Sequence, residues 1–245
     1  MIIVGICGGS GSGKSTFAER IRDGLNCSCE IMRLDCYYFD QGGKPFEERT
    51  KVNYDSPKIF DFDEMLADIR LLIDGKPVTR KGYNYAEHRR DDSEELMYPP
   101  EVLIIEGIHV FYDDRICDIM NLKLFIKVDS DICLLRRIAR DMNERGRSLE
   151  SISEQYKATV KPMREKYIDR YIDKADVVVM RGGMNEQALK TTISYIKSCV
   201  KEQRLAESEK TKATETIPNK SEQLRMNNHN ERIIPVIVKG GKGFE

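Results

Sequence analysis

Five short apolar runs divide the chain into regular segments. They are nearly unbroken rather than alternating, and most are rich in β-branched residues: 2–7, 31–34, 102–105, 122–128 and 177–180. Unbroken apolar runs of this length are typical of parallel strands that are buried on both faces. The sequence therefore predicts a central, mostly parallel sheet.

Helical patterns lie between these runs, at 14–25, 62–73, 131–145 and 185–201. In the second of them Phe62, Met65, Leu66 and Ile69 recur at the spacing of one helix face, and Gly75 ends the pattern. Strands that alternate with helices in this order predict a three-layer α/β domain.

Two polar stretches interrupt the regular pattern, at about 36–60 and 76–100, and both are rich in Tyr, Gly, Asp and charged residues. Long connections in such folds often carry the second substrate, so we expect substrate-binding insertions there. From about residue 201 to 232 the chain is polar and has no aromatic residue, which predicts a disordered or weakly helical tail. We therefore expect one domain over 1–203, with a helical lid at about 134–165, and a tail over 204–245.

Composition narrows the functional classes. The net charge of the 245 residues is −1, so bulk charge gives no reason to expect nucleic acid or a membrane as a partner. No apolar run approaches the about 20 residues of a membrane span. The seven cysteines include no C-x-x-C pair, which favours thiols in a reducing compartment over disulfides or zinc. We expect a cytoplasmic protein.

Residues 8–15 match the pattern G-x-x-x-x-G-K-[ST] in full, after a predicted strand and at the start of a predicted helix. Backbone N–H groups in such a loop face the β-phosphate of a nucleotide, and the helix start favours negative charge. The lysine places charge on the phosphates, and the following hydroxyl supplies an oxygen to Mg²⁺. The candidate nucleotide-binding residues are Gly8, Gly9, Ser10, Gly11, Ser12, Gly13, Lys14, Ser15 and Thr16.

Two carboxylates follow predicted strands. Glu106 follows the apolar run 102–105, where ligands of open α/β sheets bind, and we expect it to reach Mg²⁺ directly or through water. Asp35 follows the run 31–34 and faces the same cleft. A kinase that acts on an alcohol benefits from a carboxylate that accepts the hydroxyl proton. From spacing alone, a turn-capping role for Asp35 is equally compatible with the sequence.

An ordered set of short motifs resembles the uridine-cytidine kinase family of P-loop kinases over about residues 1–200. The motifs are 8–15, Leu34-Asp35-Cys36-Tyr37-Tyr38, 53–61, Tyr83-Asn84-Tyr85-Ala86-Glu87-His88, Glu106-Gly107-Ile108, 136–141, Glu144-Arg145-Gly146-Arg147, Gln155-Tyr156, Val160-Lys161-Pro162 and Ala175-Asp176-Val177. Each motif is short, but the order of the whole set is specific.

The resemblance implies a function and a role for each matching residue. It implies transfer of the γ-phosphate of ATP or GTP to the 5′-hydroxyl of uridine or cytidine, with Mg²⁺, in a homo-oligomer such as a tetramer. Asp35 resembles the general base near Mg²⁺, and Asp55 the carboxylate that holds the ribose 2′- and 3′-hydroxyls. Tyr83 and His88 resemble the base-recognition pair. The other implied contacts are Tyr54 and Tyr85 at the base, Arg137, Arg147 and Gln155 on the substrate side, and Arg140 and Arg145 in the lid.

The chain also departs from that family. Ser56 stands where the family usually has His, Asn84 replaces an Asp, and Tyr85 replaces a Phe. Met184 lies where some members carry an acid near the adenine. These changes concern selectivity rather than phosphoryl transfer. They leave open a related kinase for another small alcohol, such as a ribulose-phosphate or pantothenate type.

Two other classes fit the sequence less well. A GTPase switch needs the guanine-reading string Asn-Lys-x-Asp, which does not occur in the chain. A binding protein that has lost catalysis would not need Lys14, Asp35 and Glu106, and all three are present.

Overall fold

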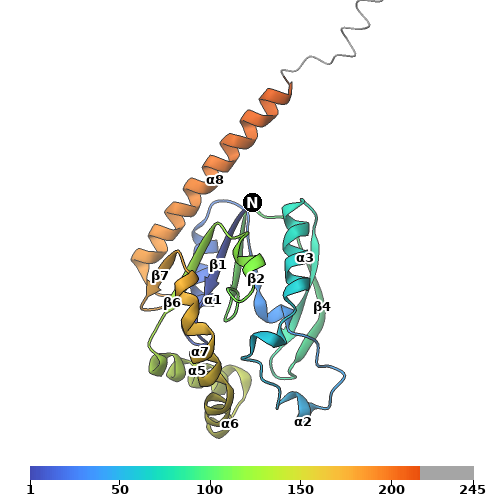
Figure 1. Ribbon diagram of the computed structural model, residues 1–245, viewed down its shortest axis with the longest axis vertical. Coiled ribbons are helices and arrows are strands. Elements are labelled where there is room, and N and C mark those ends of the chain that lie inside the picture. The colour runs from blue at the N-terminus through green and yellow to red at the C-terminus, as the bar shows by residue number, and fades with distance from the viewer. Residues whose placement is uncertain (216–245) are drawn as a thin grey trace, which may run out of the picture. The chain divides into compact units, whose positions relative to one another are not determined.

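A five-stranded parallel sheet forms the centre of the protein (Figure 1). The structure is a computed structural model that describes residues 1–215, apart from the side chains of residues 92–93 and 210–215. The strand order is β2 (Cys29–Arg33), β5 (Val102–Gly107), β1 (Ile2–Cys7), β6 (Leu122–Lys127) and β7 (Val177–Met180). All five predicted strands and the parallel sheet are therefore confirmed.

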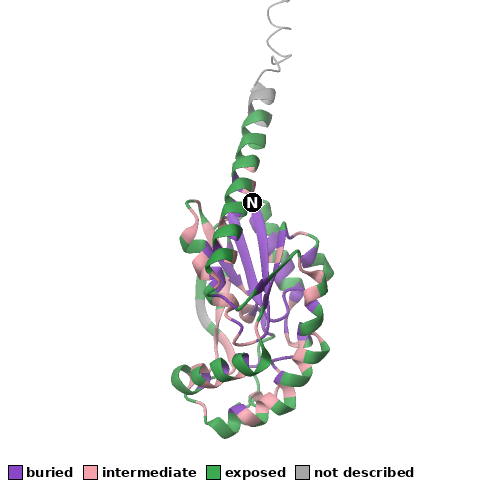
Figure 2. Ribbon diagram, turned by 90° about the vertical axis from the view of Figure 1, so that its left-hand side faces the viewer, coloured by how far each residue is buried: buried purple, intermediate pink, exposed green. Residues whose placement is uncertain are grey.

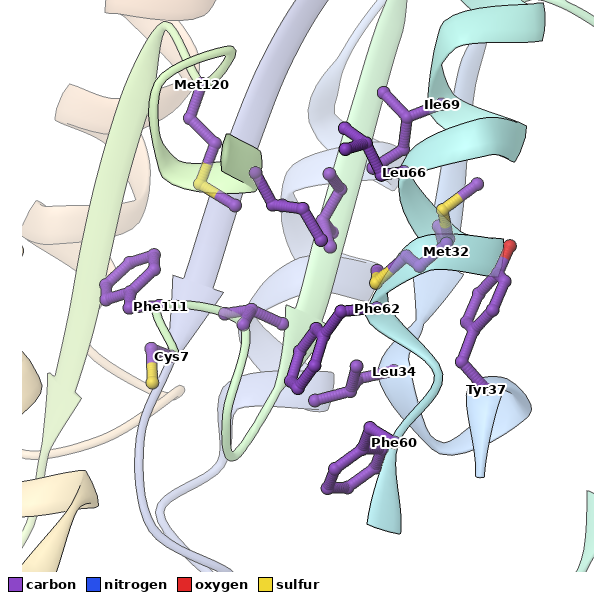
Figure 3. Packing of buried hydrophobic residues seen from close by; sticks show 14 of the residues in the cluster. Cys7, Met32, Leu34, Tyr37, Phe60, Phe62, Leu66, Ile69, Phe111 and Met120 are labelled. Carbon is purple, nitrogen blue, oxygen red and sulfur yellow. The ribbon is translucent and has the colours of Figure 1, made fainter. Parts of the chain in front are cut away.

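The two faces of the sheet bury separate hydrophobic clusters, which makes the three layers (Figure 2). Alternate residues of β1 divide between the clusters, with Val4 and Ile6 on one face and Ile3 and Cys7 on the other. Helix α1 (Lys14–Gly24) and the part of α8 (Glu186–Glu215) up to residue 201 cover the first face. Helix α3 (Phe62–Ile73) covers the second, and Figure 3 shows its residues Phe62, Leu66 and Ile69 in that cluster.

The second predicted insertion contains an antiparallel hairpin of β3 (Val78–Asn84) and β4 (Arg89–Met97), a structure that the sequence pattern did not reveal. Its strands carry many charged residues, so the apolar signal of a buried strand is missing. Of their described side chains, only those of the end residues Val78 and Met97 are buried in the core. The first insertion holds three single turns: η1 (Leu34–Tyr37), α2 (Phe46–Arg49) and η2 (Pro57–Ile59).

The segment between β6 and β7, which contains the expected lid and is called the lid below, is helical. It consists of α5 (Ser130–Arg145), α6 (Leu149–Gln155), the π-helical turn η3 (Tyr156–Val160), α7 (Lys161–Lys166) and η4 (Ile168–Lys174). Gly146 ends α5 with φ 61°, a left-handed conformation that glycine adopts without strain. A short helix, α4 (Asp114–Cys117), lies before β6.

The helix after β7 continues further than the sequence pattern predicted. Residues 1–201 form one compact unit. Helix α8, predicted to end near residue 201, extends to Glu215, so the first residues of the expected disordered or weakly helical tail are helical. Ala, Glu, Lys, Gln and Arg are good helix formers, and extending a docked helix needs no new nucleation. Residues 216–245, the rest of that expected tail, lie outside the described residues. Within 1–215 no helix is long and apolar enough to cross a membrane.

Candidate active site

The loop between β1 and α1 has the geometry of a phosphate-binding loop. Gly11 and Gly13 adopt φ values of 82° and 89°, which disfavour any residue with a side chain. A Cβ atom on Gly11 would lie 2.3 Å from the carbonyl oxygen of Cys133, so the lid helix α5 packs directly on the loop. Lys14 and Ser15 then begin α1, where backbone N–H groups favour an anion.

Ser15 and Glu106 lie side by side at the carboxyl end of the sheet. The hydroxyl of Ser15 donates a hydrogen bond of 3.0 Å to Oε1 of Glu106. The second oxygen, Oε2, is buried and has no hydrogen-bond partner among the described residues. Burial raises the pKa of the Glu106 carboxyl, and nearby Lys14 opposes that rise. A buried carboxylate with an unused oxygen beside a hydroxyl is the type of site that a hard cation fits.

This pair fits Mg²⁺ in the form that kinases use. Within residues 1–215 no cluster of three or more His, Cys, Asp or Glu side chains could hold a metal by itself. Mg²⁺ is commonly held by one or two protein oxygens together with substrate phosphates and water. Ser15 and Glu106 would supply such oxygens, and the bound cation would neutralise charge on the β- and γ-phosphates.

Replacing Glu106 by Gln is expected to raise the Mg²⁺ concentration needed for half-maximal activity by at least about 10-fold, because a neutral amide attracts a cation or its bound water less strongly. Titrating Mg²⁺ at saturating substrates measures this effect. Glu30→Gln, on the neighbouring strand β2, is the matched control and should leave the Mg²⁺ requirement unchanged. An unchanged requirement in Glu106→Gln would remove Glu106 from the metal site.

Asp35 lies in η1, directly after β2, and its carboxylate is held by the hairpin. The hydroxyl of Tyr85 donates to Oδ2 of Asp35 over 2.5 Å. The guanidinium of Arg145 lies over the Tyr85 ring, 3.9 Å from its centroid, a cation–π contact from the lid. Tyr85 therefore contacts both the candidate base and a candidate phosphate-binding arginine.

Aromatic side chains form one wall of the cavity. Tyr54 stacks on the His88 ring with centroids 5.1 Å apart, and Tyr38 lies 4.7 Å from Tyr83. Burial lowers the pKa of His88, and the positive charges of Arg147 and Arg49 lower it further. His88 is therefore neutral near pH 7 and has one donor and one acceptor nitrogen for a polar ring edge.

Asp55 is buried and lines the same cavity as these rings. Its Oδ2 accepts a hydrogen bond of 2.9 Å from the hydroxyl of Thr159, and its Oδ1 lies 3.9 Å from Nη1 of Arg137. Burial raises the pKa of the Asp55 carboxyl, while Arg137 and Thr159 oppose the rise. Ser56, which departs from the family pattern, accepts a hydrogen bond from the backbone N–H of Lys58 and so caps η2.

The lid arginines surround one buried carboxylate, Asp141, which is 0% exposed. The distances from Asp141 to Arg140, Arg137, Arg145 and Arg147 are 2.8, 3.4, 3.4 and 3.8 Å. Gln155 also holds two of these arginines, because its side-chain oxygen accepts hydrogen bonds from Arg137 and Arg147.

One cavity brings together most of the residues predicted from the sequence. Its lining includes Ser10, Lys14, Asp35, Tyr54, Asp55, Tyr83, Tyr85, His88, Arg137, Arg140, Arg145, Arg147 and Gln155. The other loop residues, Gly8, Gly9, Gly11, Ser12, Gly13, Ser15 and Thr16, do not line it, and Thr16 is exposed. Arg136, next to Arg137 in sequence, is directed to Gly182 instead.

The sequence reasoning missed several residues around this cavity. Tyr38 and Ile108 line it, and both lie in motifs that carry the family resemblance. Thr159 and His109 hydrogen-bond to Asp55 from 104 and 54 residues away in sequence, and no local pattern indicates such contacts. Asp141 could have been found from the sequence, because an acid four residues after Arg137 and four before Arg145 faces both on a helix.

A phosphate-binding loop, a strand-end acid beside its serine, a second carboxylate and an arginine-rich lid together define a P-loop kinase. The chain belongs to the phosphoribulokinase / uridine kinase family, whose model matches residues 3–188.

Similar proteins agree with this assignment. A uridine kinase from Ligilactobacillus salivarius is 41% identical over 201 residues, which cover 82% of this chain and 94% of that protein. A uridine kinase from Streptococcus pyogenes serotype M5 is 43% identical over 202 residues, covering 82% and 97%. A solved structure described as a possible uridine kinase from Bacillus stearothermophilus matches in fold, with a TM-score of 0.51 and 16% identity over 73% of this chain and 88% of that one.

Proposed function

We propose that the protein is a uridine/cytidine kinase that transfers the γ-phosphoryl group of a nucleoside triphosphate to the 5′-hydroxyl of a pyrimidine ribonucleoside. The products are UMP or CMP and the nucleoside diphosphate, the reaction of pyrimidine salvage. The observation that carries the proposal is the single cavity in which Asp35, Asp55 and the pair Tyr83 and His88 converge, with Lys14 at its phosphate end.

Each end of the cavity suits one part of such a substrate. The Asp55 carboxylate matches a vicinal diol, which offers two hydroxyl donors to one acceptor group. Tyr83 supplies an aromatic face and the neutral His88 a polar edge for a pyrimidine, with Tyr54 behind His88. These residues favour a nucleoside over a sugar phosphate, which would bring a second phosphate and no ring to stack.

Phosphoryl transfer then follows from the remaining groups. The carboxylate of Asp35 accepts the proton of the 5′-hydroxyl, whose oxygen forms the new bond to the γ-phosphorus as the bond to the β-phosphate oxygen breaks. Lys14, Arg140 and Arg145 stabilise the negative charge that spreads over the transferring group. In this proposal Asp35 also contributes to the Mg²⁺ region, together with Ser15 and Glu106.

Several properties follow from the proposal and from the resemblance of the sequence. The donor is ATP or GTP with Mg²⁺. The protein works in the cytoplasm as a homo-oligomer, for which the family pattern implies a tetramer, and it binds neither nucleic acid nor membranes.

A substrate panel tests the assignment. Purified protein is assayed with Mg²⁺ and ATP, or GTP, against uridine, cytidine, adenosine, ribulose 5-phosphate and pantothenate. Uridine and cytidine should give the highest kcat/KM. Preferred turnover of ribulose 5-phosphate or pantothenate would instead place the protein with another alcohol kinase of the same fold, and Asp55 would need a different role.

2′-Deoxyuridine is expected to be a poorer substrate than uridine by at least about 10-fold in kcat/KM. Loss of one hydroxyl leaves part of the buried Asp55 carboxylate without a donor. Asp55→Ala should remove most of this discrimination, because it removes the group that reads the diol. His88→Ala is the control, since it should weaken uridine and cytidine together and change ribose selectivity less. A wild-type ratio near one, or a ratio that survives Asp55→Ala, would contradict the role of Asp55.

A further inference from the structure

His109 is a buried histidine that the phosphoryl-transfer mechanism does not use. It is 0% exposed and lies three residues after Glu106, in the loop that leaves the end of β5. Aromatic rings enclose it, with Tyr171, Phe60 and Tyr167 at centroid distances of 5.8, 5.9 and 5.9 Å. A buried polar ring of this kind needs partners for both nitrogens.

Both nitrogens of His109 have such partners. Nε2 lies 2.7 Å from the backbone carbonyl oxygen of Asp55, and Nδ1 lies 2.9 Å from the hydroxyl of Tyr171. A carbonyl oxygen can only accept, so Nε2 carries the proton, and Tyr171 must then donate to Nδ1. Burial lowers the pKa of His109 to about 4, so the ring is neutral and keeps this single tautomer near pH 7.

Two parts of the fold therefore hold Asp55: the lid contacts its carboxylate, and the end of the sheet contacts its backbone carbonyl. Thr159 and Arg137, both from the lid, contact its carboxylate. His109, from the end of the sheet, contacts its backbone carbonyl. The carboxylate can therefore follow the lid, whereas the position of the main chain depends on the sheet.

We propose that His109 is a positioning residue for acceptor selectivity: it fixes the main chain of Asp55 on the sheet so that the carboxylate meets the sugar diol, and Tyr171 sets its tautomer. This inference rests on the proposed function, because it assumes that Asp55 reads a ribose. It places the effect of His109 on the nucleoside and not on the triphosphate, since the Asp55 segment does not form part of the phosphate-binding loop.

Four variants test the proposal. His109→Leu removes both hydrogen bonds, and His109→Gln keeps an amide N–H that can donate to the Asp55 carbonyl. Tyr171→Phe removes only the bond that sets the tautomer. Tyr167→Phe is the matched control: its ring lies as close to His109, and within residues 1–215 the structure shows no hydrogen bond from its hydroxyl. For each protein, KM for uridine, KM for ATP, the kcat/KM ratio of uridine to 2′-deoxyuridine and the melting temperature are measured.

We expect His109→Leu to raise KM for uridine and to lower the uridine to 2′-deoxyuridine ratio, each by about 3- to 10-fold, which is the effect of one lost hydrogen bond. KM for ATP should stay within about 2-fold of wild type, a change smaller than one hydrogen bond. His109→Gln should recover most of both losses, Tyr171→Phe should show a smaller loss than His109→Leu, and Tyr167→Phe should resemble wild type.

Other results would overturn the proposal. If His109→Leu and Tyr171→Phe lower the melting temperature but leave the ratio and KM for uridine unchanged, His109 only stabilises the core. Equal changes in KM for uridine and in KM for ATP would also mean that His109 only stabilises the core. If His109→Leu does not fold, the other two variants test the proposal. A uridine to 2′-deoxyuridine ratio equal to wild type in His109→Gln and a reduced ratio in Tyr171→Phe would support it. Wild-type protein that turns over no pyrimidine ribonucleoside would instead refute the proposed function itself.

Discussion

Asp35→Asn is expected to lower kcat for nucleoside phosphorylation by about 10²- to 10⁴-fold, the range of a positioned general base. The two side chains have nearly the same shape, and the amide oxygen of Asn can still accept the hydrogen bond from Tyr85. It cannot take the proton of the 5′-hydroxyl. The fold should therefore persist while the chemical step slows, which single-turnover rates and the melting temperature measure separately.

Tyr85→Phe is the control for Asp35. It removes the hydroxyl that donates a hydrogen bond to Asp35, but it keeps the Asp35 carboxylate and the aromatic ring under Arg145. We expect a smaller loss of kcat than in Asp35→Asn, because the base itself remains. If Asp35→Asn retains more than about a tenth of wild-type kcat, a loss far below that of a general base, Asp35 does not accept the proton.

The elements with a strong local signal could be predicted from the sequence. The runs that predicted the five strands of the sheet are mostly apolar, and α3 has an apolar stripe over its observed length, Phe62–Ile73. The hairpin of β3 and β4 lacks such a signal, because charged side chains occupy most of β4 and pairing with β3 rather than core burial defines it. The end of α8 was predicted too early, since a polar helix that continues from a docked one shows no apolar face of its own.

The residues of the candidate site also fall into two groups: those that a local motif predicts and those that only long-range packing brings together. Lys14 and Ser15 belong to a contiguous motif that by itself predicts phosphate binding. Glu106 and Asp35 each follow a predicted strand, which places them at the same edge of the sheet. The second layer of contacts depends on long-range packing. Thr159 reaches Asp55 from a π-helical turn in the lid, and this contact exists only once the lid has packed over the sheet.

Asp141 is a buried carboxylate at the centre of the packed lid. Five charged groups meet there: the Asp141 carboxylate and the guanidiniums of Arg137, Arg140, Arg145 and Arg147. Removing one partner of a buried ion pair typically costs about 3–5 kcal/mol because the remaining charge is left uncompensated. Arg140, Arg145 and Arg147 are partly exposed to solvent, whereas Arg137 is buried. Water therefore screens part of the repulsion, and the loss in this protein should fall at or below that range.

Asp141→Asn is therefore expected to lower the free energy of unfolding by about 2–4 kcal/mol, which overlaps the lower part of the range for a buried ion pair. The lid arginines should also lose their fixed geometry, so kcat/KM should fall by at least about 10-fold, the size of one lost charged hydrogen bond. Denaturant unfolding and steady-state kinetics measure the two effects. Asp131→Asn, at the exposed first turn of the same helix, is the control and should change neither by much.

A phosphate anion should partly replace the missing charge, because the unpaired guanidiniums of Asp141→Asn favour any anion that enters the lid. Pyrophosphate should therefore raise the melting temperature of Asp141→Asn more than that of wild type or Asp131→Asn. An equal rise in all three would mean that Asp141 stabilises α5 without holding the arginines for a phosphate. A larger rise in Asp141→Asn alone would show that the buried carboxylate occupies, within the lid, the electrostatic role that the triphosphate takes over when it binds.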